Sequence, residues 1–593
     1  MALFQRPARS GEEVLASRPL AIAPEQVMTV SEKEWYARVY RGDDAPQLTV
    51  RAVAMGCVLG FFLAFTNLYI GLKTGLYLGV AITAVILSFS IWTTLQRFGL
   101  ARTPMSILEN ACMQSCASCA GYGTGSTIIT AVPALLLLST SPTDSHGQNL
   151  PWWVVALWTL VLAILGVSLA IPMKRNMINR ERLRFPEGTA AAVTLQSLFS
   201  EGAEALKTAR ALYVSAAIGA LAPLLTGLNL VRGADGRTRE PLLPDSTALF
   251  DWLPRVRAGG EAFSLSQWTV RFDHSFVVIG AGVIVGLRTS ASLVLGGLVL
   301  IFFIGPAGLE AHWTNPLGQI VTAATSPSAA WKQIGIWYGA PLMVSYGLMV
   351  FLFQARMIAR AFTSAFDRGG VGDAEEAATR RVEVPGSWFV VGIAVGAVGT
   401  IALSWGYFGI PPLLSALAVA LSFFLTLVAA RATGETSVTP MGPMGKIAQL
   451  AYGVLMPQNA VANLATAGIT AGSAGSCADL LNDLKVGYLL GANPRRQFIA
   501  QLFGVVVGTV ATTIGYFVLI PDATAMTGTP GHEPRFPAPG AQQWKAVADV
   551  FRVGISNLHP MAREGIVVGL IAGALLAIAE TAFPRWKKWL PSA

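Results

Sequence analysis

Residues 152–173 read WWVVALWTLVLAILGVSLAIPM, an apolar run without a single charged side chain. A helix needs roughly 20 mostly apolar residues to cross the hydrocarbon core of a bilayer. This stretch therefore predicts a membrane-spanning helix. Similar stretches recur along the chain, and together they predict a protein that crosses the membrane many times.

The composition of the whole chain supports this prediction. Of its 593 residues, 53% are hydrophobic and only 13% are charged, whereas a soluble domain carries about 25% charged residues. The formal net charge is +9, and in a membrane protein such an excess is typical of cytoplasmic loops. We therefore expect no nucleic-acid partner. The five cysteines are odd in number and do not indicate a disulfide framework.

The remaining apolar stretches divide into regular and irregular ones. The regular ones are 53–72, 76–92, 211–230, 337–358, 388–405, 412–430, 498–520 and 564–583. The irregular ones, which are short or rich in Gly, Ser and Thr, are 105–138, 275–287, 290–304, 446–456 and 461–481. Some of these should be broken or re-entrant helices, which occur at membrane depth only inside protein or beside water. The predicted fold class is all-α, with about 14 (roughly 12 to 16) transmembrane helices.

Basic residues in the connecting segments predict the orientation, because moving Lys and Arg across the membrane is unfavourable. The segments that we place in the cytoplasm on this ground are 174–184, 356–381, 485–496 and the tail 584–593. Segment 139–151 contains no Lys or Arg and is predicted to be external. Both termini are then cytoplasmic, and the protein is expected in the cell (plasma or inner) membrane.

The predicted domain organisation follows from these assignments. It consists of a polar N-terminal segment 1–50, a transmembrane half 51–358 with an external loop at about 231–274, a cytoplasmic linker 359–386, a second transmembrane half 387–583 and the tail 584–593. In each half a carboxylate precedes Gly- and Ser-rich sequence and a basic loop with a proline. This suggests a two-half internal repeat, an arrangement common in transporters.

Ionisable side chains inside membrane segments are rare, because each costs about 2.5–3.5 kcal/mol on insertion scales. Glu109, Glu187, Glu435 and Asp479 lie in apolar or Gly-rich sequence and are candidates for a functional site. Each also has a structural interpretation as a carboxylate at a helix end, where the helix dipole stabilises it. That interpretation is favoured for Glu187 and for Asp483, which are close to basic clusters.

Uncharged polar residues near these carboxylates extend the candidate site. They are Asn67, Asn110, Asn463, Thr436 and Ser473, which could hydrogen-bond a bound substrate. Small residues at 121–125 and 468–475 either allow close helix packing or expose backbone to a substrate.

Other chemistry is not indicated. Cys112, Cys116 and Cys119 have the spacing of a radical-SAM iron–sulfur motif, but they lie in a membrane stretch where buried cysteines pack as small apolar residues. Zinc-protease and phosphate-loop motifs are missing. All five His fall in predicted loops, so carboxylates would have to carry a coupling proton. We expect no cofactor, no resident metal and no enzymatic activity; a channel or a membrane-embedded enzyme is the alternative from another class.

Several short motifs resemble a known transporter superfamily. They are Phe185-Pro186-Glu187-Gly188-Thr189-Ala190, Gly434-Glu435-Thr436, Pro440-Met441-Gly442, Asn463, Ala467-Gly468-Ile469, Ala478-Asp479-Leu480, Asp483-Leu484-Lys485, Gly487-Tyr488 and Pro494-Arg495. This sequence resembles the oligopeptide transporter (OPT) superfamily, in particular its yellow stripe-like branch and its prokaryotic members.

The resemblance implies a proton-coupled symporter that works by alternating access. Small peptides are the first expected substrate, and metal–chelate complexes are the alternative. We expect Glu435 first and Glu109 second to take up the proton. The partners are then the lipid bilayer, protons and the substrate, while the oligomeric state stays open, with a homodimer among the options.

Overall fold

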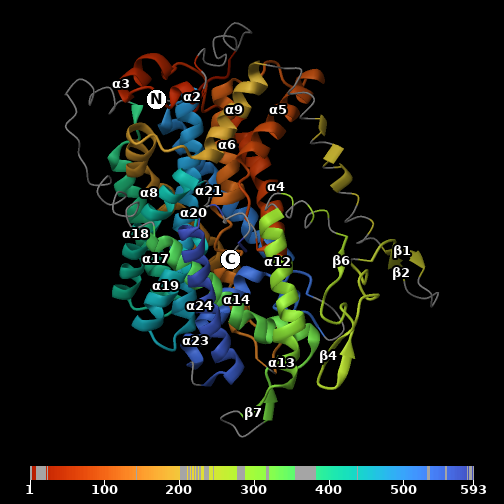
Figure 1. The fold of residues 1–593 in the computed structure, drawn as a ribbon. Helices are drawn as coiled ribbons and strands as arrows, with labels where there is room; N and C mark the ends of the chain where they lie inside the picture. The colour runs from red at the N-terminus through yellow and green to blue at the C-terminus, as the bar shows by residue number, and fades with distance from the viewer. Residues whose placement is uncertain are drawn as a thin grey trace. The chain divides into compact units, whose positions relative to one another are not determined.

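The computed structural model of the chain describes two compact units, drawn with their elements labelled in Figure 1. The described residues are 3–8, 24–75, 77–141, 143–200, 239–244, 246–274, 287–314, 320–353, 382–436, 439–529, 534–554 and 557–583, with isolated residues and short pieces elsewhere. Unit 1 comprises Met1–Arg210 and Ala355–Lys545, and unit 2 comprises Ala211–Gln354 and Ala546–Ala593. Each unit combines sequence from both of the predicted transmembrane halves.

Unit 1 is a bundle of long helices. Its main helices are α4 (Val50–Thr74), α5 (Ala81–Arg97), α6 (Ile107–Ser118), α7 (Ala131–Leu138), α8 (Trp152–Lys174), α9 (Pro186–Ser200), α17 (Gly386–Gly406), α18 (Pro412–Thr436), α19 (Met441–Leu455), α20 (Ala460–Leu490) and α21 (Pro494–Leu519). Shorter helical segments are α2 (Pro24–Val27), α3 (Glu32–Glu34), η1 (Trp35–Val39), η2 (Cys119–Gly123), η3 (Arg175–Arg180) and α22 (Thr524–Thr527). Helix α23 (Pro539–Val553) contains the last boundary between the units.

Helix α20 is the buried centre of unit 1. Nearly all of its residues from Ala460 to Leu490 are buried, because α6, α8, α9, α18, α19 and α21 pack around it (Figure 1). Small residues permit this close packing. A Cβ added to Gly166 of α8 would lie 2.5 Å from the Ser473 carbonyl oxygen of α20. Gly491 ends α20 at φ +74°, a left-handed conformation that glycine adopts readily.

Seven described helical runs are long and apolar enough to cross a membrane. They are Val50–Thr74, Trp152–Arg180, Ser290–Glu310, Gly386–Gly406, Pro412–Glu435, Pro494–Leu519 and Pro560–Ala582. These runs confirm the long apolar helices predicted at the corresponding positions, and a total of about 14 crossings stays a prediction. The predicted spans 211–230 and 275–287 lie largely outside the described residues.

Three predicted segments of unit 1 differ in their bounds or continuity from a simple helical span. Stretch 105–138, one of the irregular group in which broken helices were expected, is interrupted, because turns separate α6 and η2 from α7. The predicted start of 76–92 is wrong, since α5 begins only at Ala81. The reason is that the Asn67 side chain hydrogen-bonds both the N–H and the C=O of Leu78 and holds this residue outside the helix. Helix α20 also continues to Leu490, beyond the predicted end at residue 481.

Unit 2 combines helices with small hairpins. Its helices are α12 (Leu287–Val299), η4 (Leu300–Ile304), α13 (Gly305–Glu310), η5 (Pro327–Ala329), η6 (Trp331–Gly335), α14 (Ile336–Phe353) and α24 (Pro560–Ala582). Antiparallel pairs join β1 (Asn229–Arg232) to β2 (Arg239–Pro241), β3 (Ser246–Thr247) to β6 (Phe272–Asp273), β4 (Val256–Ala258) to β5 (Glu261–Phe263) and β7 (His312–Thr314) to β8 (Ile320–Thr322). The all-α prediction did not include these hairpins.

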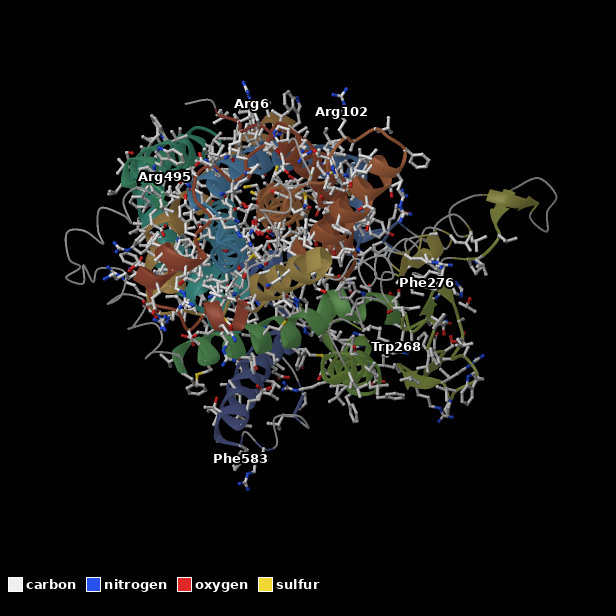
Figure 2. The ribbon with its side chains drawn as sticks, turned by 90° about the horizontal axis from the view of Figure 1, so that it is seen from above. Arg6, Arg102, Trp268, Phe276, Arg495 and Phe583 are labelled. Carbon is white, nitrogen blue, oxygen red and sulfur yellow. The ribbon has the colours of Figure 1, made fainter. Side chains whose placement is uncertain are left out.

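Local residues explain one hairpin and its attachment within unit 2. Gly259 and Gly260, both with positive φ, form the tight turn between β4 and β5. Trp268, labelled in Figure 2, is buried in a small core that includes Val256, Ile301 and Ile334. The hairpin is therefore packed against the helices of its own unit.

The N-terminal segment, expected only to be polar, docks on the C-terminal end of α20. Trp35 is 1% exposed and stacks on Tyr488 with ring centroids 4.9 Å apart. Its Nε1 donates a hydrogen bond to the Tyr488 carbonyl oxygen (2.8 Å). Glu32 pairs with Arg175 (3.1 Å), and Arg496 donates to the Ala45 carbonyl oxygen (3.1 Å).

These contacts place two predicted basic clusters at one end of unit 1. Segments 174–184 and 485–496 both meet the N-terminal segment there. Cluster 356–381 lies outside the described residues. The side chains of Arg6 and Arg102 point away from the bundle in Figure 2 and are exposed.

The other end of unit 1 carries the predicted external segment 139–151. Helix α8 begins there and α21 ends there, so the end is opposite to the docked N-terminal segment. Asn149 Nδ2 donates to the Pro521 carbonyl oxygen (2.8 Å), and the His146 ring contacts Asp522 (3.0 Å). Hydrogen bonds from Thr524 and from His146 hold the pKa of Asp522 below its ordinary value, against a smaller opposing effect of burial.

Candidate functional site

Asp479 and Asp483 form a buried acid pair on α20. They are one helical turn apart, so their carboxylates project from the same face. Helix α6 faces them with polar side chains. Ser118 Oγ donates to Asp479 Oδ1 (2.6 Å), and Gln114 Nε2 donates to Asp483 Oδ1. The acid pair is therefore held by uncharged donors from a neighbouring helix.

Helix α21 completes the surroundings of the pair. Gln501 Nε2 donates to Asp479 Oδ2 (3.0 Å), and Gln501 Oε1 accepts from Ser115 Oγ (2.8 Å). Ser115 Oγ also lies 3.3 Å from Asp483 Oδ2, and its single proton can serve only one of these acceptors at a time. Among the described residues, no Lys, Arg or His side chain forms an ion pair with either aspartate.

Glu187 approaches the acid pair from the first turn of α9. Its carboxylate packs against Gly79, where an added Cβ would collide with it. The next residue, Gly188, packs against α20, where an added Cβ would lie 2.3 Å from the Asn482 carbonyl oxygen. The structure thus brings two of the predicted site residues, Glu187 and Asp479, together with Asp483 in what we call the acidic cluster.

The break between α6 and α7 lies beside this acidic cluster. Ser476 of α20 donates to the Gly123 carbonyl oxygen (2.7 Å) at the end of η2. Asn67 donates to the Gly121 carbonyl oxygen (2.9 Å), and Tyr77 Oη donates to the Tyr122 carbonyl oxygen (2.6 Å). Asn67 therefore shapes the irregular backbone near the cluster, and its amide is already hydrogen-bonded there.

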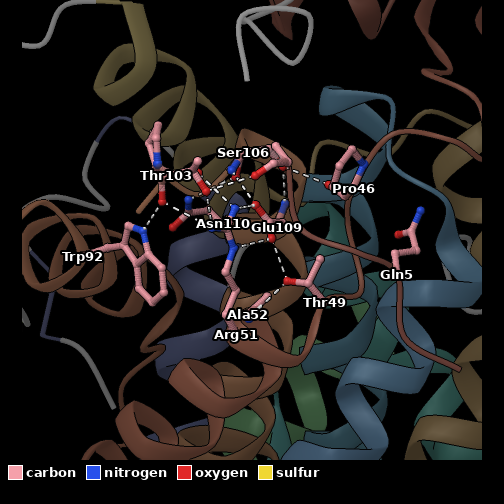
Figure 3. Close-up of polar contacts among 12 residues, drawn as sticks. Gln5, Pro46, Thr49, Arg51, Ala52, Trp92, Thr103, Ser106, Glu109 and Asn110 are labelled. Carbon is pink, nitrogen blue, oxygen red and sulfur yellow. Dashed lines mark hydrogen bonds and ion pairs between the residues drawn. The ribbon is translucent and has the colours of Figure 1, made fainter. Parts of the chain in front are cut away.

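Glu109 has a different position, in the first turn of α6, whereas Ser118 is the last residue of that helix. Figure 3 shows Glu109 with its partners Ser106, Thr49 and Arg51. It forms a capping box with Ser106, whose backbone N–H donates to Glu109 Oε2 (2.8 Å). Arg51 Nη2 pairs with the same oxygen at 2.6 Å, and Thr49 Oγ1 donates to Oε1 (2.6 Å). Ser118 lies nine positions after Glu109, about 13 Å along the helix axis. Glu109 is a fully buried ion-pair partner outside the acidic cluster.

Glu435 is likewise an ion-pair partner outside the acidic cluster. It lies near the end of α18, 3.2 Å from Arg431, and its side chain is 34% exposed. Arg431 also pairs with Glu181 at 2.5 Å. The Phe185 backbone N–H donates to the Gly434 carbonyl oxygen (2.9 Å), so this end of α18 is fastened to the segment before α9.

The other predicted polar residues lie at separate positions in the structure, each with its own local contacts. Asn463 exchanges hydrogen bonds with Gln449, through the Gln449 side chain (2.8 Å) and backbone carbonyl (2.6 Å). Asn110 and Ser473 each donate to a backbone carbonyl of their own helix. Thr436 is the last residue of α18, and its side chain is not described. None of the described side chains in this group contacts the acidic cluster through a hydrogen bond.

Sequence reasoning missed the uncharged partners of the acidic cluster. These are Gln114, Ser115, Ser118 and Gln501. Their signal is weak, because polar residues at positions i, i+1 and i+4 of a helix merely indicate one polar face. Only the folded structure shows that this face of α6 contacts the aspartates of α20.

One buried cation lies further along α20. Lys485 is fully buried, and its Nζ has no hydrogen-bond partner among the described residues. The Nζ lies 5.5 Å from the centroid of the Tyr488 ring, a cation–π arrangement. Gln114 Oε1 is also buried and unpartnered within the described part of the chain. In those same residues, no group of three or more His, Cys, Asp or Glu side chains is arranged to hold a metal ion.

Long apolar helices around a central helix with buried charges define a polytopic membrane protein with a polar interior site. Residues 47–593 match the family described as OPT oligopeptide transporter protein. The chain therefore belongs to the OPT family.

Relatives of known name cover most of the chain. A Saccharomyces cerevisiae protein named as an oligopeptide transporter is 25% identical over 562 residues, which is 77% of this chain and 76% of the relative. A Haemophilus influenzae protein named in the same way is 25% identical over 477 residues, 75% of this chain and 68% of the relative. The metal-nicotianamine transporter YSL2 of Arabidopsis thaliana is 24% identical over 609 residues, 92% and 84% of the two chains. These relatives are transporters and not enzymes.

Proposed function

We propose that this protein is a proton-coupled symporter of small peptides, with Asp479 and Asp483 as the proton-carrying pair. The observation that supports the proposal is the burial of this pair in a membrane protein among uncharged donors. Two ionised carboxylates so close together repel each other and are poorly solvated. Uptake of one proton removes the repulsion and part of the desolvation cost. Protonation can therefore favour one conformation of the helices over another.

The ion pairs of the other carboxylates argue for this choice. Glu109 is paired with Arg51, and Glu435 with Arg431. Protonating Glu109 would leave Arg51 without its carboxylate partner, which is costly for a largely buried arginine. Protonating Glu435 would remove one of the two carboxylates that pair with Arg431, the other being Glu181. We therefore assign Glu109 and Glu435 a structural role. We assign Glu187 the role of a third acid that adjusts the proton affinity of the Asp479–Asp483 pair.

Groups for substrate recognition are present near the acidic cluster. Lys485 Nζ could pair with the carboxylate of a peptide, and Gln114 Oε1 could accept from a peptide N–H. Both groups are buried, and a buried polar group without a partner is unfavourable. A substrate that satisfies them would gain affinity. In alternating access the helices around α20 would rearrange to open this region first to one side and then to the other.

A metal–chelate substrate is the second candidate. The observation that favours it is that the Arabidopsis metal-nicotianamine transporter matches 92% of this chain, against 77% for the yeast relative, at nearly equal identity. Competition distinguishes the two candidates. A metal chelate that blocks uptake of a labelled tripeptide would share its site, whereas uptake of the chelate alone would replace the peptide proposal.

The proposed setting is the cell membrane with both termini in the cytoplasm. The docking of the N-terminal segment beside two Lys- and Arg-rich segments supports this orientation, because such segments remain on the cytoplasmic side. Transport into the cell would then move substrate and protons from the end near residues 139–151 to the end near Trp35.

The test is uptake of a labelled tripeptide by proteoliposomes with and without an inward proton gradient. We expect the wild type to accumulate the peptide only with the gradient. Asp479→Asn and Asp483→Asn should lose accumulation but keep exchange of internal for external peptide, which needs no net proton movement. The control Glu435→Gln should retain accumulation. Full coupling in both asparagine variants would remove the acid pair from the mechanism.

The same experiment separates the other classes of protein. A channel would conduct the peptide without saturation and without accumulation. A membrane-embedded enzyme would convert the peptide, which chromatography of the vesicle contents would detect.

A further inference from the structure

Two free thiols face each other between two helices of unit 1. Cys57 of α4 and Cys116 of α6 have their Sγ atoms 3.7 Å apart. Cys116 is the middle cysteine of the Cys112, Cys116 and Cys119 motif, whereas Cys57 lies far from that motif in sequence. The motif therefore has one member with a thiol partner on another helix.

The close packing of α4 on α6 explains this distance. A Cβ added to Gly56 would lie 2.8 Å from Cys116 Cβ, and one added to Gly60 would lie 2.6 Å from Ala120 Cβ. The glycines bring the two helices together on either side of the thiols. Because an S–S bond is about 2.05 Å long, bonding requires the sulfurs to approach by only about 1.7 Å. Rotation of the cysteine side chains can supply a movement of this size.

The other cysteines have different surroundings. Cys112 and Cys119 are fully buried, and Cys477 is buried with its Sγ 3.7 Å from the Met173 Sδ. Cys57 alone among the five is partly exposed. A small oxidant that enters the apolar region therefore meets Cys57 first, with the Cys116 thiol already beside it.

We propose that Cys57 and Cys116 are a site of reversible oxidation that forms a disulfide between α4 and α6. With hydrogen peroxide, the Cys57 sulfur attacks one oxygen and the O–O bond breaks. The second oxygen leaves with a proton as water, and Cys57 becomes a sulfenic acid. The Cys116 sulfur then attacks the Cys57 sulfur, and the hydroxyl group leaves with the Cys116 proton as a second water. Two thiols and one peroxide give one disulfide and two waters, and peroxide receives the two electrons.

The disulfide would act on the acidic cluster through α6. Ser115 and Ser118 flank Cys116 and hydrogen-bond the partners and members of the cluster on α20 and α21. A covalent bond to α4 restricts movement of this helix relative to α4. This consequence rests on the proposed transport function, because a fixed α6 matters only if the helices rearrange during the cycle.

The test of the disulfide needs no substrate. The full-length protein in lipid vesicles is treated with hydrogen peroxide and then unfolded in detergent, so that buried thiols become accessible. Free thiols are alkylated, and peptides are mapped by mass spectrometry without reduction. We expect the number of alkylated cysteines to fall from five by two, to three, with a linked Cys57–Cys116 peptide that dithiothreitol cleaves. Cys57→Ser and, as a second variant, Cys57→Ala should lack this link, whereas Cys112→Ser should retain it. Alkylation of both cysteines after oxidation, or linkage of Cys116 to another cysteine, would overturn the proposal.

The mechanical consequence is tested separately. Gradient-driven tripeptide uptake is compared for reduced and oxidised wild type and for Cys57→Ser. We expect oxidation to lower uptake by wild type at least about tenfold, which is a barrier change of about 1.4 kcal/mol, and to leave Cys57→Ser unchanged. Unchanged uptake by a fully linked wild type would overturn the effect on transport. Absence of uptake in reduced wild type would contradict the proposed function instead, while the peptide map still decides the disulfide.

Discussion

Replacing Trp35 with alanine should release the N-terminal segment from the end of α20. The indole is 1% exposed, stacks on Tyr488 with the ring planes 3° apart, and donates to the Tyr488 carbonyl oxygen. Lys174 Nζ lies 5.7 Å from the Trp35 ring centroid and 5.8 Å from that of Tyr488. One substitution therefore removes stacking, a hydrogen bond and a cation–π contact together.

The size of the effect follows from these contacts. Truncation of a buried Trp to Ala costs about 3–5 kcal/mol, which includes about 0.5–1.5 kcal/mol for the aromatic pair. At about 1.4 kcal/mol for each factor of ten, the opening equilibrium of the segment should shift by roughly two to three and a half powers of ten. Trp35 belongs to the same buried apolar cluster as Leu484 and Leu489 of α20. We therefore expect the largest change in residues 24–49 and a smaller one at this end of α20.

Hydrogen exchange of the purified protein, read by mass spectrometry, measures this shift directly. Amides that are protected only while the segment is docked should exchange faster by the stated factor. Tyr36→Phe removes one hydrogen bond to Glu383 (3.0 Å) and should change exchange by about fivefold, for a loss of about 1 kcal/mol. Trp252→Ala is the control, because that side chain is 79% exposed. Less than a tenfold change for Trp35→Ala would refute the idea that Trp35 anchors the segment.

Three further predictions concern separate parts of unit 1. Glu109→Gln leaves Arg51 without its partner and should destabilise the protein by about 3–5 kcal/mol, measured as a lowered thermal midpoint; an unchanged midpoint would contradict the buried ion pair. Gly166→Ala overpacks the contact of α8 with α20 and should destabilise by about 1–3 kcal/mol. The control Gly297→Ala, where nothing lies within 4 Å of an added Cβ, should be neutral or stabilising, and equal effects would exclude the close contact. The pKa of Asp522 is lower in the folded protein than its ordinary value. The contribution of Asp522 to stability is therefore complete above the ordinary Asp pKa of about 3.9 and is lost as the pH falls through the lowered pKa. Hydrogen exchange of residues 143–150 should then accelerate at acid pH in the wild type, but not in Asp522→Asn.

The sequence predicts the long apolar helices well, because their signal is local. The run 152–173 corresponds to α8 (Trp152–Lys174), since lipid or protein surroundings select the same apolar residues at every position. The start of α5 could not be predicted in this way. It depends on the Asn67 side chain of another helix, and apolar residues before Ala81 look helical in isolation.

The candidate site was predictable only in part. Asp479 and Glu187 stand out because charges are rare in apolar sequence, and the structure packs the start of α9 beside this part of α20, at Gly188 and Asn482. The partners of Glu109 could not be read in the same way, since Arg51 is 58 residues away in sequence. The docking of Trp35 on Tyr488 spans 453 residues. Contacts of this kind depend on the fold and leave no local pattern.

The charges of α20 have a consequence for how the protein is made. Asp479, Asp483 and Lys485 would each oppose entry of this helix into the membrane by about 2.5–3.5 kcal/mol at the bilayer centre, so we expect α20 to insert poorly when it leaves the ribosome alone. Helix α21 follows after Gly491 and brings Gln501 to Asp479. An insertion assay with glycosylation sites, comparing α20 alone with the α20–α21 hairpin, would show equal insertion if this reasoning fails. If the hairpin inserts better than α20 alone, burial of these charges depends on the order of synthesis, in which α6 is inserted before α20 and α21 follows it.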